Sequence, residues 1–133
     1  MKMKAPLKND ETVKTNRGLL LDAFAALRQR GFFARANYLC CSSCGFSALQ
    51  VRFDELTPEE KSETKGFVFW HSQNEDDIWA RGEVNLAFGS FSGFDEDEKV
   101  GKEIVSVLES FGLHPEWDEN PARKILVPLK ESK

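Results

Sequence analysis

Apolar residues recur at the spacing of an α-helix in two long segments of the chain. The first segment covers residues 12–30, ends at Gly31 and carries arginines in its last turn. The second covers residues 91–113, has acidic residues at positions 95–98 near its start and contains Gly112 near its end. Such a stripe, closed by glycine, is typical of an amphipathic helix packed on a core. The stripes consist of Leu20, Phe24 and Leu27 in the first segment and of Val100, Ile104, Val107, Leu108 and Phe111 in the second.

Three other segments have the aromatic and β-branched residues of strands. They are residues 32–38 ("FFARANY"), 66–71 ("GFVFWH") and 83–88 ("EVNLAF"). Because residues 66–71 are apolar on both faces, we expect a central strand there, paired antiparallel with residues 83–88. Residues 74–82 between these two strands predict one or two helical turns, since acids lie at their start.

The segment of residues 46–54 fits two patterns. Leu49, Val51 and Phe53 alternate as in a strand, whereas Phe46, Leu49 and Phe53 recur at helical spacing. We favour a helix, because two serines precede the segment as candidate N-caps and no turn signal interrupts it.

Cap and turn residues define the remaining elements. Thr57, Pro58 and Glu60 have the pattern of a capping box with proline at the first helical position, which predicts a short helix. Residues 113–117 and 123–129 are short extended pieces joined by a turn-rich stretch, and they predict a closing hairpin.

Together these elements predict an α+β domain. We expect a two-layer sandwich in which three main helices pack on a mostly antiparallel sheet of four or five strands. Residues 1–12 are rich in lysine and polar side chains and predict a flexible N-terminal tail. Because no linker and no repeat interrupts the rest, residues 13–129 predict a single domain.

The charge of the chain narrows its expected partners. Its 22 acidic residues exceed its 18 basic residues, so the net charge is -4 and no global positive field attracts nucleic acid or anionic lipid. The sequence also contains no signal-peptide core and no run of about eighteen apolar residues. We therefore expect a soluble cytoplasmic protein with a protein partner and without nucleic-acid or membrane partners. Its oligomeric state is left open.

All three cysteines, Cys40, Cys41 and Cys44, lie in the stretch "YLCCSSCGF". An odd number of cysteines so close together does not suit a disulfide framework, and we expect reduced thiols. One interpretation is a metal site. Thiolates and imidazoles suit zinc, and Cys41, Cys44, His71 and His114 form the most reasonable quartet. No other cofactor is expected.

The cysteines have two further interpretations. A thiolate at a helix N-terminus has a lowered pKa, so Cys41 or Cys44 beside His71 would form a Cys–His nucleophile pair. Alternatively, the cysteines are small buried hydrophobic residues at a strand-to-helix junction. We favour burial, because free cysteine is among the most buried residue types.

Three aromatic residues, Trp79, Phe94 and Trp117, lie in or beside predicted loops. Any of them that is exposed would be an anchor for a protein partner. The acidic run at residues 95–98 lacks the spacing of a calcium-binding loop, and we expect it to stabilise a helix N-terminus. The sequence contains no phosphate-binding loop, no dinucleotide fingerprint and no nucleophile elbow.

Three motifs in combination resemble an uncharacterised bacterial family of small domains of unknown function. They are "CCSSCG", "GFVFWHSQNEDD" and "WDENPARKILV", within residues 28–127. In that family a Cys-Cys-x-x-Cys-Gly element precedes an aromatic-aromatic-His-x-Gln-Asp element, and a Trp-Asp pair leads into the last strand. This chain has Asn74 and Glu75 where the family has its acid after Gln73. The resemblance implies a fold and no activity.

Because no catalytic motif is complete, we expect a non-catalytic binding or protein-interaction domain whose biochemical role is unknown. The first alternative is a thiol- or metal-dependent enzyme centred on Cys41, Cys44 and His71. The second alternative is an interaction module with a structural zinc site.

Overall fold

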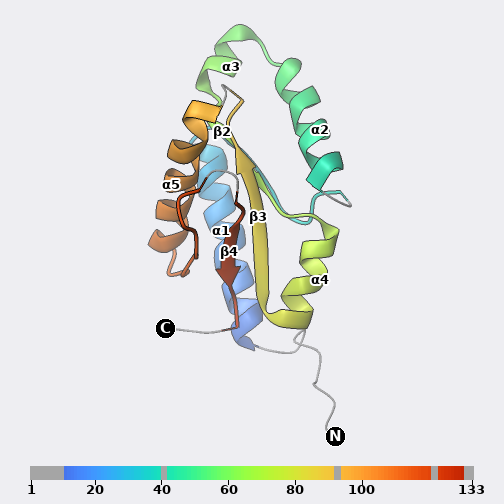
Figure 1. Cartoon of the computed structure of the whole chain (residues 1–133), viewed down its shortest axis with the longest axis vertical. Helices are drawn as coiled ribbons and strands as arrows, with labels where there is room; N and C mark the ends of the chain where they lie inside the picture. Colours follow the sequence, from blue (N-terminus) through green and yellow to red (C-terminus); the bar gives the residue numbers. More distant parts are fainter. Residues whose placement is uncertain (1–10, 40–41, 92–93, 121–122, 131–133) are drawn as a thin grey trace, which may run out of the picture.

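The computed structural model describes residues 11–39, 42–91, 94–120 and 123–130, with the backbone alone at positions 42, 43, 94 and 95. These residues form five helices and a four-stranded sheet, which confirms an α+β fold (Figure 1). Residues 1–10 of the predicted tail lie outside this part, whereas residues 11 and 12 are already helical. The elements are α1 (Glu11–Gln29), β1 (Phe32–Arg35), α2 (Ser42–Asp54), α3 (Pro58–Glu63), β2 (Gly66–Phe69), α4 (Ser72–Arg81), β3 (Glu83–Gly89), α5 (Phe94–Ser110) and β4 (Ile125–Pro128).

The sheet has the order β1-β2-β3-β4. Strand β2 lies between β1 and β3 and is antiparallel to β3, as the sequence predicted. Strands β3 and β4 are also antiparallel, but β1 and β2 are parallel, so the sheet is mixed. The parallel pair arises because α2 and α3 fill the connection from β1 to β2. Such a helical crossover returns the chain in its original direction.

One face of the sheet carries the main core. Alternate strand residues point to this face, where α1 and α5 cover them (Figure 1). Burial of each large apolar side chain there contributes about 1.5–3 kcal/mol. The largest fully buried members are Trp70, Phe24, Leu20, Leu27, Ile78, Leu86, Ile104, Leu108, Ile125 and Leu129.

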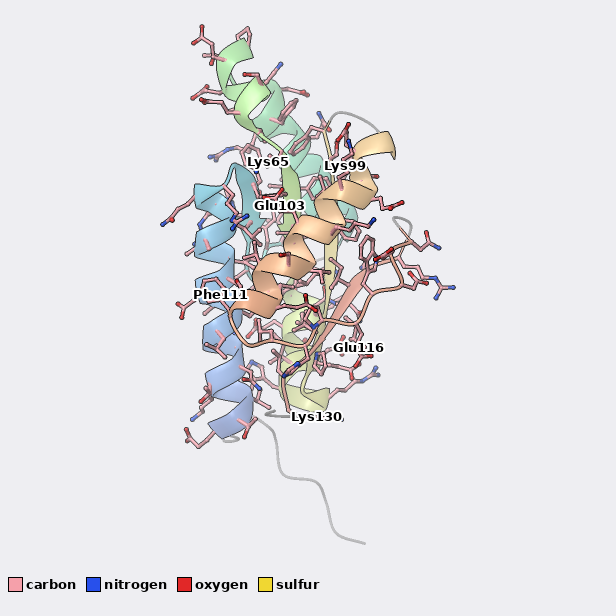
Figure 2. All side chains as sticks on the ribbon, turned by 90° about the vertical axis from the view of Figure 1, so that its left-hand side faces the viewer. Lys65, Lys99, Glu103, Phe111, Glu116 and Lys130 are labelled. Carbon is pink, nitrogen blue, oxygen red and sulfur yellow. The ribbon has the colours of Figure 1, made fainter. Side chains whose placement is uncertain are left out.

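An exposed ion-pair network joins α5 to its neighbours on this face. The Glu103 carboxylate of α5 lies 3.0 Å from Nζ of Lys65, just before β2, and 3.4 Å from Nη1 of Arg30, just after α1. Figure 2 shows Lys65 and Glu103 on this face, with α1 and α5 side by side. Because the side chains are partly hydrated, each pair contributes less than about 1 kcal/mol.

The opposite face carries a layer of aromatic side chains under α2. Figure 1 shows α2 on the other side of the sheet from α1 and α5. Leu49, Phe67 and Phe69 form a second, smaller buried cluster there, and Phe53 of α2 stacks on Phe91 with ring centroids 4.2 Å apart. The helical interpretation of residues 46–54 is therefore confirmed, because Leu49 and Phe53 share the face of α2 that meets the sheet.

The predicted capping box at the start of α3 is also confirmed. The backbone N–H of Glu60 donates to Oγ1 of Thr57 (3.2 Å), and the backbone N–H of Thr57 donates to Oε1 of Glu60 (2.9 Å). No helix in the described part of the chain is long and apolar enough to cross a bilayer.

The predicted closing hairpin is reduced to a single bridge. Strand β4 pairs along its length with β3, while Leu126 meets Glu116 in an isolated bridge. Trp117 accounts for the irregular loop between them, because its Nε1–H donates to the carbonyl oxygens of Asn120 (3.0 Å) and Arg123 (3.1 Å). These bonds fold the loop back on the indole.

Candidate functional site

Exposed apolar side chains gather on α2 and the residue stretch before it. Leu39 is 46% exposed, Phe46 47% and Val51 57%. They are the exposed large hydrophobic residues of the described part of the chain, and all lie between positions 39 and 51. We call Leu39, Phe46 and Val51 the α2 surface. Single exposed apolar residues are ordinary, but three of them within thirteen positions of the chain make this segment a candidate for partner binding.

Leu39 is held in an unusual backbone conformation. Its φ angle is 59°, in the left-handed region that a leucine rarely occupies. Two backbone hydrogen bonds fix the segment to the end of β2, since the N–H of Tyr38 donates to Trp70 O (2.7 Å) and the N–H of Ser72 donates to Leu39 O (2.9 Å). The surrounding structure therefore holds Leu39 in a backbone conformation that is strained for a leucine.

Helix α2 rests on the sheet through a glycine and aromatic rings. Gly45 is buried against Phe69, and Phe46 meets the ring of Phe67 edge-on, with centroids 5.4 Å apart. Phe46 thus has one side on the aromatic layer and the other in solvent. Helix α2 therefore has an apolar face against the sheet, while its Val51 side chain is exposed.

Cys44 lies on the exposed side of α2, in its first turn. This corrects the expectation that the cysteines are buried, as far as Cys44 is concerned. The reason is helical geometry: Gly45 and Leu49 occupy the inner face, which leaves Cys44 pointing outward. Cys40 and Cys41 lie outside the described residues.

His71 is the N-cap residue of α4 and is 5% exposed. Its backbone N–H donates to Oδ1 of Asn74 (3.3 Å), while its side-chain Nδ1 has no hydrogen-bond partner among the described residues. Burial and the charge of Lys124 lower the pKa of His71 below its ordinary value of 6.5, and Asp77 opposes this shift. His71 is therefore a neutral imidazole at neutral pH.

The structure separates two residues of the predicted metal quartet by the sheet. Cys44 belongs to α2 on one face, whereas His114 follows α5, which covers the other face, and is exposed. Within the described residues no group of three or more His, Cys, Asp or Glu side chains is placed to hold a metal ion. Because Cys41 lies outside those residues, the zinc site and the Cys–His pair remain predictions.

Two of the three predicted aromatic anchors are half-buried covers of the core. Trp79 packs against the main core, and Trp117 meets the ring of Phe88 edge-on at 5.3 Å between centroids. The indole N–H of each is occupied, in Trp79 by Glu75 and in Trp117 by loop carbonyls. The third, Phe94, is one of the residues whose side chain the structure does not describe.

An open cleft of about 420 Å³ lies beside Trp117. Its charged residues are balanced, and one opposite pair, Asp118 and Arg123, is 3.6 Å apart. The cleft therefore offers no net charge to select an ionic ligand. Its lining residues are Glu116, Trp117, Asp118, Arg123, Lys124 and Leu126.

The carboxylate of Glu75 is a centre that the sequence did not reveal. The guanidinium of Arg17 donates to both of its oxygens, from Nη2 at 3.0 Å and Nε at 3.1 Å. The indole N–H groups of Trp70 (2.8 Å) and Trp79 (2.9 Å) donate to it as well. The helical i, i+4 spacing of Glu75 and Trp79 was readable in the sequence, but the contact with Arg17 spans 58 positions.

This network is structural in character. Burial alone would raise the pKa of Glu75, but the hydrogen bonds from Arg17 and Trp70, the charge of Arg17 and the bond from Trp79 lower it below 4.5. Because four donors occupy the carboxylate, Glu75 is a fixed anion that joins α1, α4 and Trp70, the residue after β2. The lowered pKa keeps the carboxylate ionised at neutral pH, so it carries no proton to donate as a general acid.

Comparisons with known proteins agree with a domain whose role is unassigned. No curated protein and no solved structure matches the chain. A family model described as a domain of unknown function (DUF6891) matches residues 9–132. The match spans all of the described elements, and the chain therefore belongs to the DUF6891 family of domains of unknown function.

Proposed function

We propose that this domain is a non-catalytic protein-interaction module of the cytoplasm, and that the α2 surface contacts its partner. The observation that carries the proposal is the concentration of exposed Leu39, Phe46 and Val51 in one segment. Burying half-exposed side chains of this size contributes about 1 kcal/mol each, which is the scale of an interface anchor.

The backbone at Leu39 supports the same proposal. A leucine at a φ of 59° is costly in the free protein, and an asparagine or glycine would fit that conformation better. A strained residue is retained where the surrounding structure uses it. An apolar anchor presented to a partner is a use that a smaller residue could not supply.

The enzyme alternative has weaker support. A thiol nucleophile needs a base within hydrogen-bond reach, yet Nδ1 of His71 has no hydrogen-bond partner among the described residues, which include Cys44. The carboxylate of Glu75 already accepts hydrogen bonds from Arg17, Trp70 and Trp79. These placements favour binding over catalysis.

Photo-crosslinking tests the proposal in cells. A photoreactive amino acid at position 51 is compared with the same amino acid at position 106, which is exposed on α5 across the sheet. We expect a protein adduct from position 51 that position 106 does not give. The adduct partner is then purified for direct measurement.

Affinity measurements with that purified partner give the decisive comparison. Val51→Gln removes an exposed apolar side chain with little change in helix propensity, and Ser106→Gln is the matched control. We expect Val51→Gln to weaken binding about fivefold or more and Ser106→Gln to leave it unchanged. Equal affinities of the two variants, or adducts of the same kind from both positions, would contradict the proposal.

A further inference from the structure

Two arginine side chains meet at the free edge of the sheet. Arg28, in the last turn of α1, donates from Nη1 to the carbonyl oxygen of Ala34 at 2.9 Å. Arg35, at the end of β1, donates from Nη1 to the same oxygen at 3.2 Å. Because β1 is an edge strand, both guanidinium groups lie at the border of the sheet.

A third arginine, Arg52 of α2, lies within electrostatic reach of Arg35. Burial is the main cause of a lowered pKa at Arg35, and the charges of Arg52 and Arg28 lower it further. Tyr38 opposes them, so its phenol also lies within electrostatic reach of Arg35. The ring of Phe33, 5.6 Å below the guanidinium, fixes Arg35 on the α2 side of the sheet.

This cluster lacks the carboxylates that neutralise other arginines of the protein. Arg17, Arg30 and Arg123 each form an ion pair with an acid. Among the described residues, none of the three cluster arginines does so. Arg81 also has no ion pair among the described residues, but Arg28 and Arg35 share one acceptor oxygen. The cluster therefore concentrates positive charge in a chain of net charge -4, which favours binding of an anion.

Capping the strand edge does not account for the arrangement. Charged side chains protect edge strands, and the Ala34 carbonyl oxygen has two lone pairs for two donors, but a single charged side chain is enough for that protection. Two guanidinium groups on one carbonyl oxygen bring like charges together. Each guanidinium has five N–H donors, and Arg28 and Arg35 each use one of them within the described residues. The remaining donors are available to a ligand.

We propose that Arg28, Arg35 and Arg52 bind a phosphate group at the β1 edge. Guanidinium forks match the oxygens of phosphate, and three positive charges suit a doubly charged group better than a single carboxylate. The phosphate belongs either to a small molecule or to a phosphorylated side chain. This inference does not rest on the α2 surface, although Arg52 follows Val51 directly in α2.

Titration with inorganic phosphate tests the site directly. The full-length protein is titrated with sodium phosphate at constant ionic strength, with chloride as the balancing anion, while NMR follows the arginine Nε–Hε resonances. Arg35→Gln and Arg52→Gln are compared with Arg81→Gln, which changes an exposed arginine at the end of α4. Arg35→Lys keeps the charge and removes the fork.

We expect saturable binding in the wild type and in Arg81→Gln, with affinity about tenfold or more weaker in Arg35→Gln and Arg52→Gln. Arg35→Lys is expected to bind more weakly than the wild type. If phosphate does not saturate, or if Arg81→Gln loses as much affinity as Arg52→Gln, the site is refuted. Arg52 is exposed, so its variant tests the site even where Arg35→Gln disturbs folding.

A short phosphoserine peptide and its unphosphorylated copy distinguish the two sources of phosphate. Tighter binding of the phosphopeptide than of inorganic phosphate, without binding of the copy, supports a phosphorylated protein. Equal affinities support a small-molecule phosphate. Equal binding of both peptides would contradict recognition of phosphate.

Discussion

At the scale of single residues, Leu39 combines an exposed apolar side chain with a left-handed backbone. We predict that Leu39→Asn stabilises the free protein by about 1 kcal/mol, because asparagine tolerates a φ of 59° far better than leucine does. Urea unfolding measures the change. The same variant should weaken binding of the partner identified by crosslinking.

The substitution Leu39→Ala distinguishes the two possible causes of the expected stabilisation, the backbone conformation and the exposed side chain. Alanine removes the exposed apolar side chain but keeps the backbone penalty, so we expect its stability to stay close to that of the wild type. If Leu39→Ala stabilises the protein as much as Leu39→Asn does, the gain comes from the side chain, and the argument from backbone strain is wrong.

Glu75 is the residue on which the interior polar network depends. We predict that Glu75→Gln lowers the free energy of unfolding by about 2–3 kcal/mol, because Arg17 loses a charged partner and the amide cannot accept all four donors. Glu103→Gln is the control, since Glu103 also pairs with two basic residues but at the surface. It should cost less than about 1 kcal/mol. Similar losses in the two variants would show that the network adds nothing beyond a surface ion pair.

At the scale of elements, the seating of α2 depends on Gly45. A Cβ at this position would lie 2.7 Å from Cζ of Phe69, and Phe69 is 1% exposed and cannot turn away. We predict that Gly45→Ala destabilises the protein by about 1–3 kcal/mol despite the higher helix propensity of alanine. Amide hydrogen exchange should increase mainly in α2.

Gly18→Ala is the matched control for this substitution. Gly18 lies in α1, and a Cβ there meets no heavy atom within 4 Å. The same change should therefore stabilise the protein by about 0.5–1 kcal/mol. Opposite signs at the two glycines are the expected result, and a gain at both would show that α2 is not packed as described.

The sequence predicted elements better than it predicted where they end. Helix α2 could be chosen over a strand because Leu49 and Phe53 keep helical spacing, and α3 because Thr57 and Glu60 cap it. The sequence predicted a closing hairpin, whereas its two extended pieces pair only through the Glu116–Leu126 bridge. Its extended pieces were readable, but the bonds from Trp117 to two loop carbonyls depend on tertiary placement that a local pattern does not contain.

At the scale of the whole molecule, long-range pairing was the part that the sequence could not predict. The antiparallel pairing of β2 and β3, which are joined through α4, was predicted, whereas the parallel pairing of β1 and β2 requires knowledge of the crossover through α2 and α3. The same limit applies to the candidate sites. Arg28, Arg35 and Arg52 come from three elements, and Arg17 reaches Glu75 across 58 positions. Neither cluster has a local signature.

The stability of the whole fold at acid pH depends on two ionisable groups, His71 and Glu75. The pKa of His71 is lowered from 6.5 and that of Glu75 from 4.5. In both cases the unfolded chain binds the proton more readily than the folded chain, so acid favours unfolding. The contribution of His71 is present above pH 6.5 and is lost as the pH falls through its folded pKa. That of Glu75 is present above pH 4.5 and is lost below it.

We therefore predict that the free energy of unfolding falls in two successive steps as the pH decreases from 8 to 3. His71→Gln should flatten the curve just below pH 6.5 and leave the lower step, whereas Glu75→Gln should flatten the step below pH 4.5 and leave the upper one. Urea unfolding at each pH provides the free energy of unfolding. The slope of this free energy against pH is compared between variants, because each substitution also changes the free energy itself at every pH. A wild-type slope below pH 6.5 that persists in His71→Gln would assign the upper step to another group. Loss of both steps in one variant would contradict the assignment of one step to each group.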